Sequence, residues 1–326
     1  MAGDDLSALF DPAGVAVVGA SDDRLKWGHW LAVRALRGAG RRDVHLVNRR
    51  GGEVLGRPAH RSLLELPGPV ELAVLSVPAA ALEQSVDDAI AAGARAIVAI
   101  TGGEADGDAG GARDAAIAAR VRAAGVRLLG PNCLGVFDAG AELELVSNDL
   151  PRGAIGLISQ SGNLALEIGG RAAAVGLGFS RFASLGNQVD LQAAELVRAF
   201  AEHAPTRLIA LYAEDLGDGR GLAAAAADAG KPVLLLSVEH SEATVRAARS
   251  HTGALVSDAL AVEAACAAAG IRRVRSPREL VDTAEALLRL PRARGNRVAV
   301  LADGGGHGGL AAGLAHAAGM DVPALG

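Results

Sequence analysis

A histidine between small hydroxyl residues is the side chain of this sequence best suited to carry a covalent intermediate. His251 lies in the run Ser250-His251-Thr252-Gly253, which follows an expected strand at 232–238 and an expected short helical stretch at 241–249. Small neighbours leave an imidazole accessible, and neutral imidazole is a good nucleophile near physiological pH. The plainer interpretation is an ordinary surface-loop histidine, so the case for His251 depends on its surroundings.

Two other segments offer the groups that such a histidine needs. Glu214 closes an expected strand, where its carboxylate could hold one ring nitrogen of a histidine; the plainer interpretations are a helix-capping carboxylate or a residue that faces solvent. The run Ser159-Gln160-Ser161-Gly162 joins an expected strand at 154–159 to an expected helix at 163–175. Backbone N–H groups at a helix start bind anions, although Ser161 is equally suited to capping alone. A further turn, Gly186-Asn187-Gln188-Val189-Asp190, offers amide donors beside that anion site.

The elements that must position these groups alternate along the chain. Short β-branched runs alternate with helical stretches rich in Ala and Leu, which predicts an α/β fold with parallel, doubly wound sheets. In the first half we expect strands at 15–19, 44–47, 72–76, 96–100 and 126–129. In the second half we expect strands at 154–159, 178–184, 207–213, 232–238 and 270–274, and then a helix at 277–290. Right-handed crossovers bring the carboxyl ends of such strands to one edge, where ligands bind.

The strand ends of the first half carry small, hydroxyl and amide residues, which suit a ligand that approaches the backbone. They are Gly19, Ala20 and Ser21; Asn48, Arg49 and Arg50; Ser76, Val77 and Pro78; Thr101, Gly102 and Gly103; and Gly130, Pro131, Asn132 and Cys133. The first turn lacks the full GxGxxG fingerprint, and arginines instead of an acidic residue follow the second strand. This pattern favours a phosphorylated ribose, as in NADP or the 3′-phosphate of CoA; the alternative is a tight turn without a ligand.

Irregular segments divide the chain into three expected units. A less regular stretch at 138–152 separates the two β-α series, and after residue 291 a strand at 297–301, a glycine-rich turn at 303–309 and a helix at 310–318 start a third. The expected domains are 1–150, 151–291 and 296–326. A lone βα piece cannot bury both of its faces, so we expect the third unit to be truncated or to dock on the second.

Composition excludes several classes of protein. The 326 residues carry a net charge of −5 with no block of like charge, so we expect no nucleic-acid and no membrane partner. The two cysteines, Cys133 and Cys266, make neither a disulfide framework nor a CxxC metal site. The first ten residues do not form a signal peptide, and no apolar run reaches membrane-spanning length. We therefore expect a cytoplasmic protein without a metal site of its own.

Taken together and in order, these segments resemble the NDP-forming acyl-CoA synthetases, the superfamily of succinyl-CoA synthetase α-subunits and archaeal-type acetate–CoA ligases. The resemblance runs from about Phe10 to Leu325 and rests on Val17-Val-Gly-Ala-Ser21, Gly51-Gly-Glu-Val-Leu-Gly56, Leu129-Gly-Pro-Asn-Cys-Leu-Gly-Val136, Ser159-Gln-Ser-Gly162, Gly186-Asn187 with Asp190, and Ser250-His-Thr-Gly-Ala-Leu255. It implies a Rossmann-like CoA-binding domain, a flavodoxin-like ligase domain, and the start of a second flavodoxin-like domain.

The same resemblance implies a role for each group of site residues. It makes His251 the residue that is phosphorylated and Glu214 the carboxylate that orients it. The implied phosphate-binding residues are Ser159, Gln160, Ser161, Gly162, Gly186, Asn187, Thr252 and Gly253. Family CoA contacts fall at or near Gly19, Ser21, Arg50, Ser76, Pro78 and Asn132. To these we add their neighbours on the same edge, Ala20, Asn48, Val77, Thr101, Gly103 and Cys133.

The implied reaction interconverts acyl-CoA, a nucleoside diphosphate and phosphate with a carboxylic acid, CoA and a nucleoside triphosphate. It passes through an acyl phosphate and a phosphohistidine. The sequence has no GxxxxGK[ST] loop and no further domain of ATP-grasp type. The resemblance therefore implies that an ATP-grasp β-subunit or fused domain holds ADP or ATP with Mg²⁺, and that the protein is an oligomer. Nothing in the sequence identifies the acyl group or distinguishes ADP from GDP.

One departure from the family keeps two other functions open. The family usually has a lysine and then a glycine-arginine pair after the strand at 232–236, whereas this chain has Ser237-Val238-Glu239-His240-Ser241. Loss of that positive charge favours a non-catalytic CoA-binding regulatory or scaffold protein, while retention of both Glu214 and His251 favours the enzyme. The second alternative is an NADP-dependent oxidoreductase, although the second half shows no hydride-transfer site.

Overall fold

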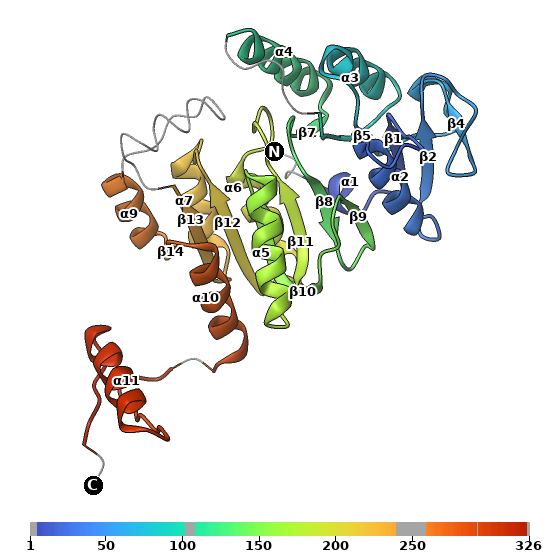
Figure 1. The fold of residues 1–326 in the computed structure, drawn as a ribbon. Coiled ribbons are helices and arrows are strands. Elements are labelled where there is room, and N and C mark those ends of the chain that lie inside the picture. Colours follow the sequence, from blue (N-terminus) through green and yellow to red (C-terminus); the bar gives the residue numbers. More distant parts are fainter. Residues whose placement is uncertain (1–4, 102–107, 239–258, 292, 325–326) are drawn as a thin grey trace. The chain divides into compact units, whose positions relative to one another are not determined.

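The computed structural model describes residues 5–101, 108–238, 259–291 and 293–324. It divides into two compact units, Met1–Leu288 and Arg289–Gly326. The first unit contains two β-sheets, and the second contains one helix with its flanking turns (Figure 1). Among the described residues, no helix has both the length and the apolar character needed to cross a membrane.

The first sheet has the strand order β3-β4-β2-β1-β5-β6-β7 and is parallel except for the β3–β4 pair. Its strands are β1 (Gly14–Val18), β2 (Asp43–Val47), β3 (Glu53–Val54), β4 (Arg57–His60), β5 (Leu72–Leu75), β6 (Ala96–Ala99) and β7 (Arg127–Leu129). Its helices are α1 (Ser7–Phe10), α2 (Trp27–Arg37), α3 (Leu82–Ala91) and α4 (Asp108–Ala124), with 3₁₀ turns η1 (Leu63–Glu65) and η2 (Ala79–Ala81). Alternate strand residues face opposite helices, because Val15 packs with α2 and Ala16 packs with α3 and α4.

The second sheet has the order β14-β13-β12-β10-β11-β8-β9. Its strands are β8 (Gly135–Asp138), β9 (Leu143–Val146), β10 (Arg152–Ser159), β11 (Phe179–Ser184), β12 (Leu208–Ala213), β13 (Val233–Ser237) and β14 (Arg272–Val274). Helices α5 (Gly162–Ala174) and α10 (Pro277–Arg289) cover one face, and α6 (Ala193–Glu202), α7 (Gly219–Asp228) and α9 (Ala259–Ala268) cover the other (Figure 1). Two sheets with parallel cores and helices on both faces confirm the expected fold class.

An antiparallel hairpin, β8–β9, joins the second sheet before residue 150. Its second strand falls in the stretch that the sequence suggested is irregular, because four-residue strands leave too short a pattern to detect. The buried Arg34 of α2 donates to Asp149 at 2.9 Å, so the segment after the hairpin is also held by the first sheet's helix layer. The expected domain boundary near 150 remains a prediction, while the change of sheet occurs at Gly135.

The second unit contains less regular secondary structure than the sequence predicts. Helix α11 (Gly305–Ala317) replaces the helix expected at 310–318 and starts inside the predicted glycine-rich turn. The strand expected at 297–301 is wrong, since only Arg297 forms a parallel bridge, with Asp321. Leu301, at the end of this run, is fully exposed, and apart from the bridge to Asp321 the run has no strand beside it to extend the pairing.

The two sheets of the first unit meet through backbone contacts between residues 130–132 and the loop after β11. The Asn187 N–H donates to the Pro131 carbonyl at 2.9 Å. Gly186 has a φ of +57°, and a Cβ on it would lie 2.2 Å from the Pro131 oxygen. Next to them, the buried Asp190 accepts hydrogen bonds from the Leu128 N–H at 2.9 Å and the Arg127 Nε at 3.2 Å. The carboxyl ends of β7 and β11 are therefore fixed against each other.

We predict that Gly186→Ala destabilises the protein much more than Gly230→Ala. Both glycines have a left-handed φ, +57° and +63°, but a Cβ on Gly230 meets nothing within 4 Å. Backbone strain alone costs about 1 kcal/mol, whereas strain plus a backbone clash costs about 2–4 kcal/mol. Urea unfolding of both variants measures the difference. Equal losses of unfolding free energy would show that the contact between the sheets adds no constraint.

Candidate active site

Most of the predicted site residues lie in the described part of the chain. His251, Thr252, Gly253 and Gly103 lie outside the described residues. The others fall on the carboxyl edges of the two sheets, or on the loops that leave those edges. Among the described residues, no group of three or more His, Cys, Asp or Glu side chains is arranged to hold a metal ion.

The Ser159–Gly162 run forms the start of helix α5, as expected. Ser161 is the N-cap, and its Oγ accepts the Leu164 N–H at 3.3 Å. The buried Ser159 donates its hydroxyl to the Ser161 carbonyl at 2.7 Å and so holds the turn from beneath. The first turn of α5 contains no acidic residue. The partial positive charge of the helix start is therefore not neutralised within that turn, as an anion site requires.

Glu214 lies beside this helix start, on the neighbouring strand. Strands β10 and β12 run parallel, with Ser159 paired to Tyr212, so Glu214 leaves the same edge two residues later. The Tyr212 hydroxyl donates to Glu214 Oε1 at 3.2 Å. Burial, together with the Glu214 carboxylate, raises the pKa of Tyr212 well above its usual range, so the phenol remains a donor. The structure thus brings together the two predicted groups at 159–162 and 214.

The Gln160 side chain has a position that the sequence did not predict. Its Oε1 accepts the backbone N–H of Glu214 and that of Asp215, the latter at 2.9 Å. From the β11 loop, Gln188 Nε2 donates to the Asp215 carbonyl at 3.4 Å. The backbone that carries the Glu214 carboxylate is thus held by two glutamines from different strands. Phosphate binding by Gln160 stays a prediction, but its side-chain oxygen is already engaged with the protein.

Asn132 and Asn187, predicted for two different ligands, contact each other. Asn132 Nδ2 donates to Asn187 Oδ1 at 3.4 Å, and Asn187 Nδ2 donates to Asp114 at 2.9 Å. Asn132 also donates its backbone N–H to the Thr101 carbonyl at 2.8 Å, and Thr101 donates its hydroxyl to the Val77 carbonyl at 2.7 Å. A chain of hydrogen bonds therefore runs from the edge of the first sheet to the loop of the second.

The remaining predicted residues of the first sheet assemble around the turn after β1. A Cβ on Gly19 would lie 2.0 Å from the Ser76 oxygen, and its φ is +87°, so only glycine fits there. Asn48 donates to the Ala20 carbonyl at 2.8 Å and accepts the Arg50 N–H at 2.9 Å. Arg50 and Pro78 are exposed at this edge, together with the partly exposed Ser21, Ser76 and Val77.

Two predicted side chains do not face a ligand. Ala20 is completely buried and packs in the core. The Cys133 thiol is buried 3.2 Å from the Ala99 carbonyl, and burial raises its pKa to about 12. Both residues sit at strand ends, where the sequence pattern alone does not tell which side chains point inward. Any ligand contact by Ala20 or Cys133 has to come from the backbone.

The chain's two tryptophans were not singled out from the sequence. Trp27 and Trp30 lie in the first turn of α2, directly after the β1 turn, and are 46% and 43% exposed. Because only 2% of the chain is aromatic, two tryptophans three positions apart are a sequence signal that could have marked this helix start as a candidate ligand contact. Gly28 lies between them, and a Cβ on it would meet the Gly19 oxygen at 1.9 Å, so this helix start packs directly against the turn.

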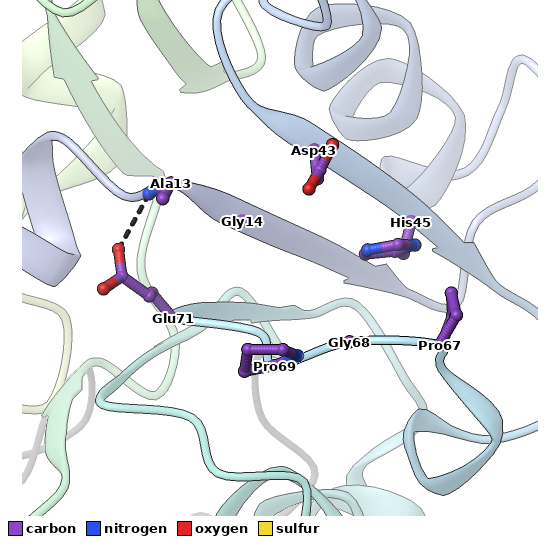
Figure 2. A pocket seen from close by; sticks show the side chains of 8 residues that line it. All are labelled: Ala13, Gly14, Asp43, His45, Pro67, Gly68, Pro69 and Glu71. Carbon is purple, nitrogen blue, oxygen red and sulfur yellow. Dashed lines mark hydrogen bonds between the residues drawn. The ribbon is translucent and has the colours of Figure 1, made fainter.

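A hollow of about 340 Å³ on the first sheet belongs to a different region (Figure 2). Gly14 and Asp43, which line it, are the first residues of β1 and β2, so it lies at the amino ends of the strands. His45 lines it beside Asp43 on β2, and Glu71 lines it from across the hollow, where it accepts the Ala13 N–H at 2.7 Å (Figure 2). Burial lowers the pKa of His45. None of the predicted site residues lines this hollow, and it is not the candidate site.

Comparison with known proteins assigns both halves of the first unit. Residues 14–139 match the family model described as a CoA binding domain, and residues 152–287 match the succinyl-CoA ligase like flavodoxin domain. The chain is 35% identical to the α subunit of ADP-forming acetate–CoA ligase II of Pyrococcus furiosus, over 94% of this chain and 68% of that protein. It is 31% identical to a trans-feruloyl-CoA synthase from an unknown prokaryotic organism, over 97% of this chain and 46% of that protein.

A solved structure agrees with these matches. The dinucleotide forming acetyl-coenzyme A synthetase 1 of Ca. Korarchaeum cryptofilum, in complex with phosphate and ADP, superposes with a TM-score of 0.90. The two sequences are 30% identical, and the match covers 97% of this chain and 69% of that one. With both domain families matched in order, and with an α subunit related along most of its length, this chain belongs to the NDP-forming acyl-CoA synthetases, as a relative of the acetate–CoA ligase α subunits.

Proposed function

We propose that this chain is the α-type, CoA-binding and phosphate-carrying part of an NDP-forming acyl-CoA synthetase. The observation that carries the proposal is the contact between Gln160 and the Glu214 backbone, which sets a carboxylate beside the start of α5. A carboxylate next to an anion-binding turn suits a histidine that must be oriented at one nitrogen and phosphorylated at the other. The chain of hydrogen bonds from Val77 to Asn187 supports transfer between the two edges.

The chemistry then proceeds in three balanced steps. A phosphate oxygen attacks the thioester carbonyl of acyl-CoA, CoA leaves as its thiolate, and an acyl phosphate forms. A ring nitrogen of His251 attacks the phosphorus and the carboxylic acid leaves as its carboxylate, while Glu214 accepts a hydrogen bond from the other ring nitrogen. The terminal oxygen of a nucleoside diphosphate then attacks the phosphohistidine, which restores the imidazole and yields the triphosphate. The reverse direction makes acyl-CoA.

Completion of the cycle needs a partner. We propose that an ATP-grasp subunit or domain binds ADP or ATP with Mg²⁺ and receives the phosphate from His251, in a cytoplasmic oligomer. The relatives named above are described for acetate and for feruloyl groups. The substrate class is therefore a carboxylic acid whose size is left open, and the acid is to be found by screening.

We predict that radiolabel from inorganic phosphate, supplied with an acyl-CoA and the ATP-grasp partner, is incorporated into the wild-type chain and is absent from His251→Ala. Glu214→Gln should lower the rate of labelling by about 100-fold, because the ring loses its charged hydrogen-bond acceptor. The matched control is Asp215→Asn, whose side chain keeps the oxygen that accepts the Gly217 N–H at 2.9 Å, and it should label normally. Persistent label in His251→Ala would contradict the phosphohistidine.

We predict that Gln160→Met slows labelling about tenfold, because two partly buried N–H groups lose their acceptor and the Glu214 carboxylate shifts. Gln160→Glu keeps an acceptor oxygen and should label faster than Gln160→Met. If Gln160 instead donates to phosphate, the carboxylate variant will be the slower of the two. CoA affinity, measured in parallel, should be unchanged in both variants because Gln160 lies on the second sheet.

We predict that CoA changes the tryptophan fluorescence of the chain, since Trp27 and Trp30 are both partly exposed at the edge of the first sheet. Arg50→Ala should weaken CoA binding about tenfold, the loss expected for one charge-assisted hydrogen bond to the 3′-phosphate. The same variant should bind dephospho-CoA like the wild type, which makes that ligand the control. An equal loss for both ligands would show that Arg50 does not contact the 3′-phosphate.

A further inference from the structure

A hollow of about 950 Å³ opens at the carboxyl ends of β12, β13 and β14. It reaches Leu164 in the first turn of α5 and also Tyr212, whose hydroxyl donates a hydrogen bond to Glu214. It therefore adjoins the candidate active site on the side away from the first sheet, because β13 and β14 lie beyond β12 in the strand order. Its size exceeds that of a single phosphate and is sufficient for a nucleotide.

The described residues that line this hollow have an uneven distribution of charge. Three cations, Arg272, Arg273 and Arg275, all come from β14 and the residue that follows it. Two carboxylates, Glu263 and Glu279, also line it. The Glu279 carboxylate accepts the Arg275 backbone N–H at 2.8 Å and so helps to close the start of α10. The excess of arginines favours an anionic ligand.

Arg273 is the arginine directed toward the strand end next to the active site. In the parallel pair of β13 and β14 it lies opposite Leu235, and its Nη2 donates to the Ser237 hydroxyl at 3.4 Å. Arg273 is partly buried, whereas Arg272 and Arg275 are exposed. A guanidinium that is partly withdrawn from water is screened less and binds a phosphate through two parallel N–H bonds.

Arg273 supplies a positive charge that the end of β13 lacks in the sequence. The carboxyl end of β13, Ser237-Val238, contains no cation, and an acidic residue, Glu239, follows it. The structure supplies a positive charge at Ser237 from the adjacent strand, 36 residues later in the sequence. A neighbouring strand can provide such a charge because parallel strands end at the same edge.

We propose that Arg273 makes this hollow a phosphate subsite, in which its guanidinium binds a phosphoryl group of inorganic phosphate or of a nucleoside diphosphate. The proposal rests on the proposed function, because it explains how a chain without a cation at the end of β13 stabilises a phosphate beside Glu214. It adds a binding residue from β14, a strand on which no site residue was predicted.

The test is isothermal titration of the full chain with inorganic phosphate, with ADP and with CoA, at low salt. Arg273→Gln removes the charge but keeps a donor for Ser237, so it preserves the fold better than a truncation to alanine. It should weaken binding of phosphate, of ADP, or of both by about tenfold, and Arg273→Lys, which keeps the charge but loses the paired N–H groups, should weaken binding by less than Arg273→Gln does. The control is Arg278→Ala, because Arg278 is 81% exposed on α10, pairs with Asp282 at 3.5 Å, and does not line the hollow. It should bind as the wild type does.

Each outcome bears on one proposal. If Arg273→Gln binds both phosphate and ADP more weakly, the hollow is a phosphoryl site. If it binds only ADP more weakly, the ligand is a nucleotide. Both results support the role of Arg273. Unchanged binding by Arg273→Gln, an equal loss in Arg278→Ala, or no binding of phosphate or ADP by the wild type overturns it. CoA affinity and labelling separate this result from the proposed function. If the wild type binds no CoA and takes no label on His251, the proposed enzyme itself is contradicted. If the wild type binds CoA and is labelled, but Arg273→Gln binds phosphate and ADP normally, only the phosphate subsite is contradicted.

Discussion

The contact between Gly186 and the Pro131 carbonyl fixes how the two sheets share their ligand edges. There is no room for a side chain at this point, and the neighbouring N–H of Asn187 uses the same carbonyl as its acceptor. The buried Asp190 then ties the β11 loop to β7 through the Leu128 N–H. Because the contacts of Gly186 and Asn187 are made by backbone atoms, and the Asp190 side chain is buried, the distance between the edges depends little on flexible side chains. A phosphate carrier that serves a CoA site needs such a fixed separation, since small displacements of reacting groups cost large factors in rate.

Small residues at the edges and large ones in the core have complementary roles in this chain. All five phenylalanines are fully buried, and Phe10 and Phe200 pack edge to face between the sheets at a centroid distance of 5.6 Å. The Arg181 guanidinium lies 4.2 Å from the centre of the Phe10 ring and also binds Asp138 at 2.7 Å. One hydrophobic cluster runs from β1 through α1 to α6 and β12, so the two sheets share a core. Phe10 and Phe200 thus help to join the sheets, the other three phenylalanines pack in a second core cluster, and the ligand edges are built largely from small and polar residues.

The polar side chains around Glu214 hold its backbone and its carboxylate in place. Gln160 accepts two backbone N–H groups, Gln188 donates to the next carbonyl, and Tyr212 donates to the carboxylate. Partly buried polar groups of this kind are costly unless they are satisfied, and here their partners come from three different strands. The same reasoning applies to Arg273, whose charge reaches the end of β13 from β14. The properties of the site therefore depend on neighbouring strands as much as on any continuous motif.

The sequence by itself determined the β-α alternation, the strand ends that carry ligand-binding residues, and the family. These follow from local patterns, because hydrophobic periodicity and glycine-containing turns are set by residues close together in the chain. It did not determine the β8–β9 hairpin, the burial of the Cys133 thiol, the hold of Gln160 on Glu214, or the cation that Arg273 brings to Ser237. Each of these depends on which strands become neighbours and on the direction of a side chain at a strand end. Only the tertiary structure decides such pairings: most join residues that are tens of positions apart, and the short β8–β9 hairpin is stabilised by joining the second sheet.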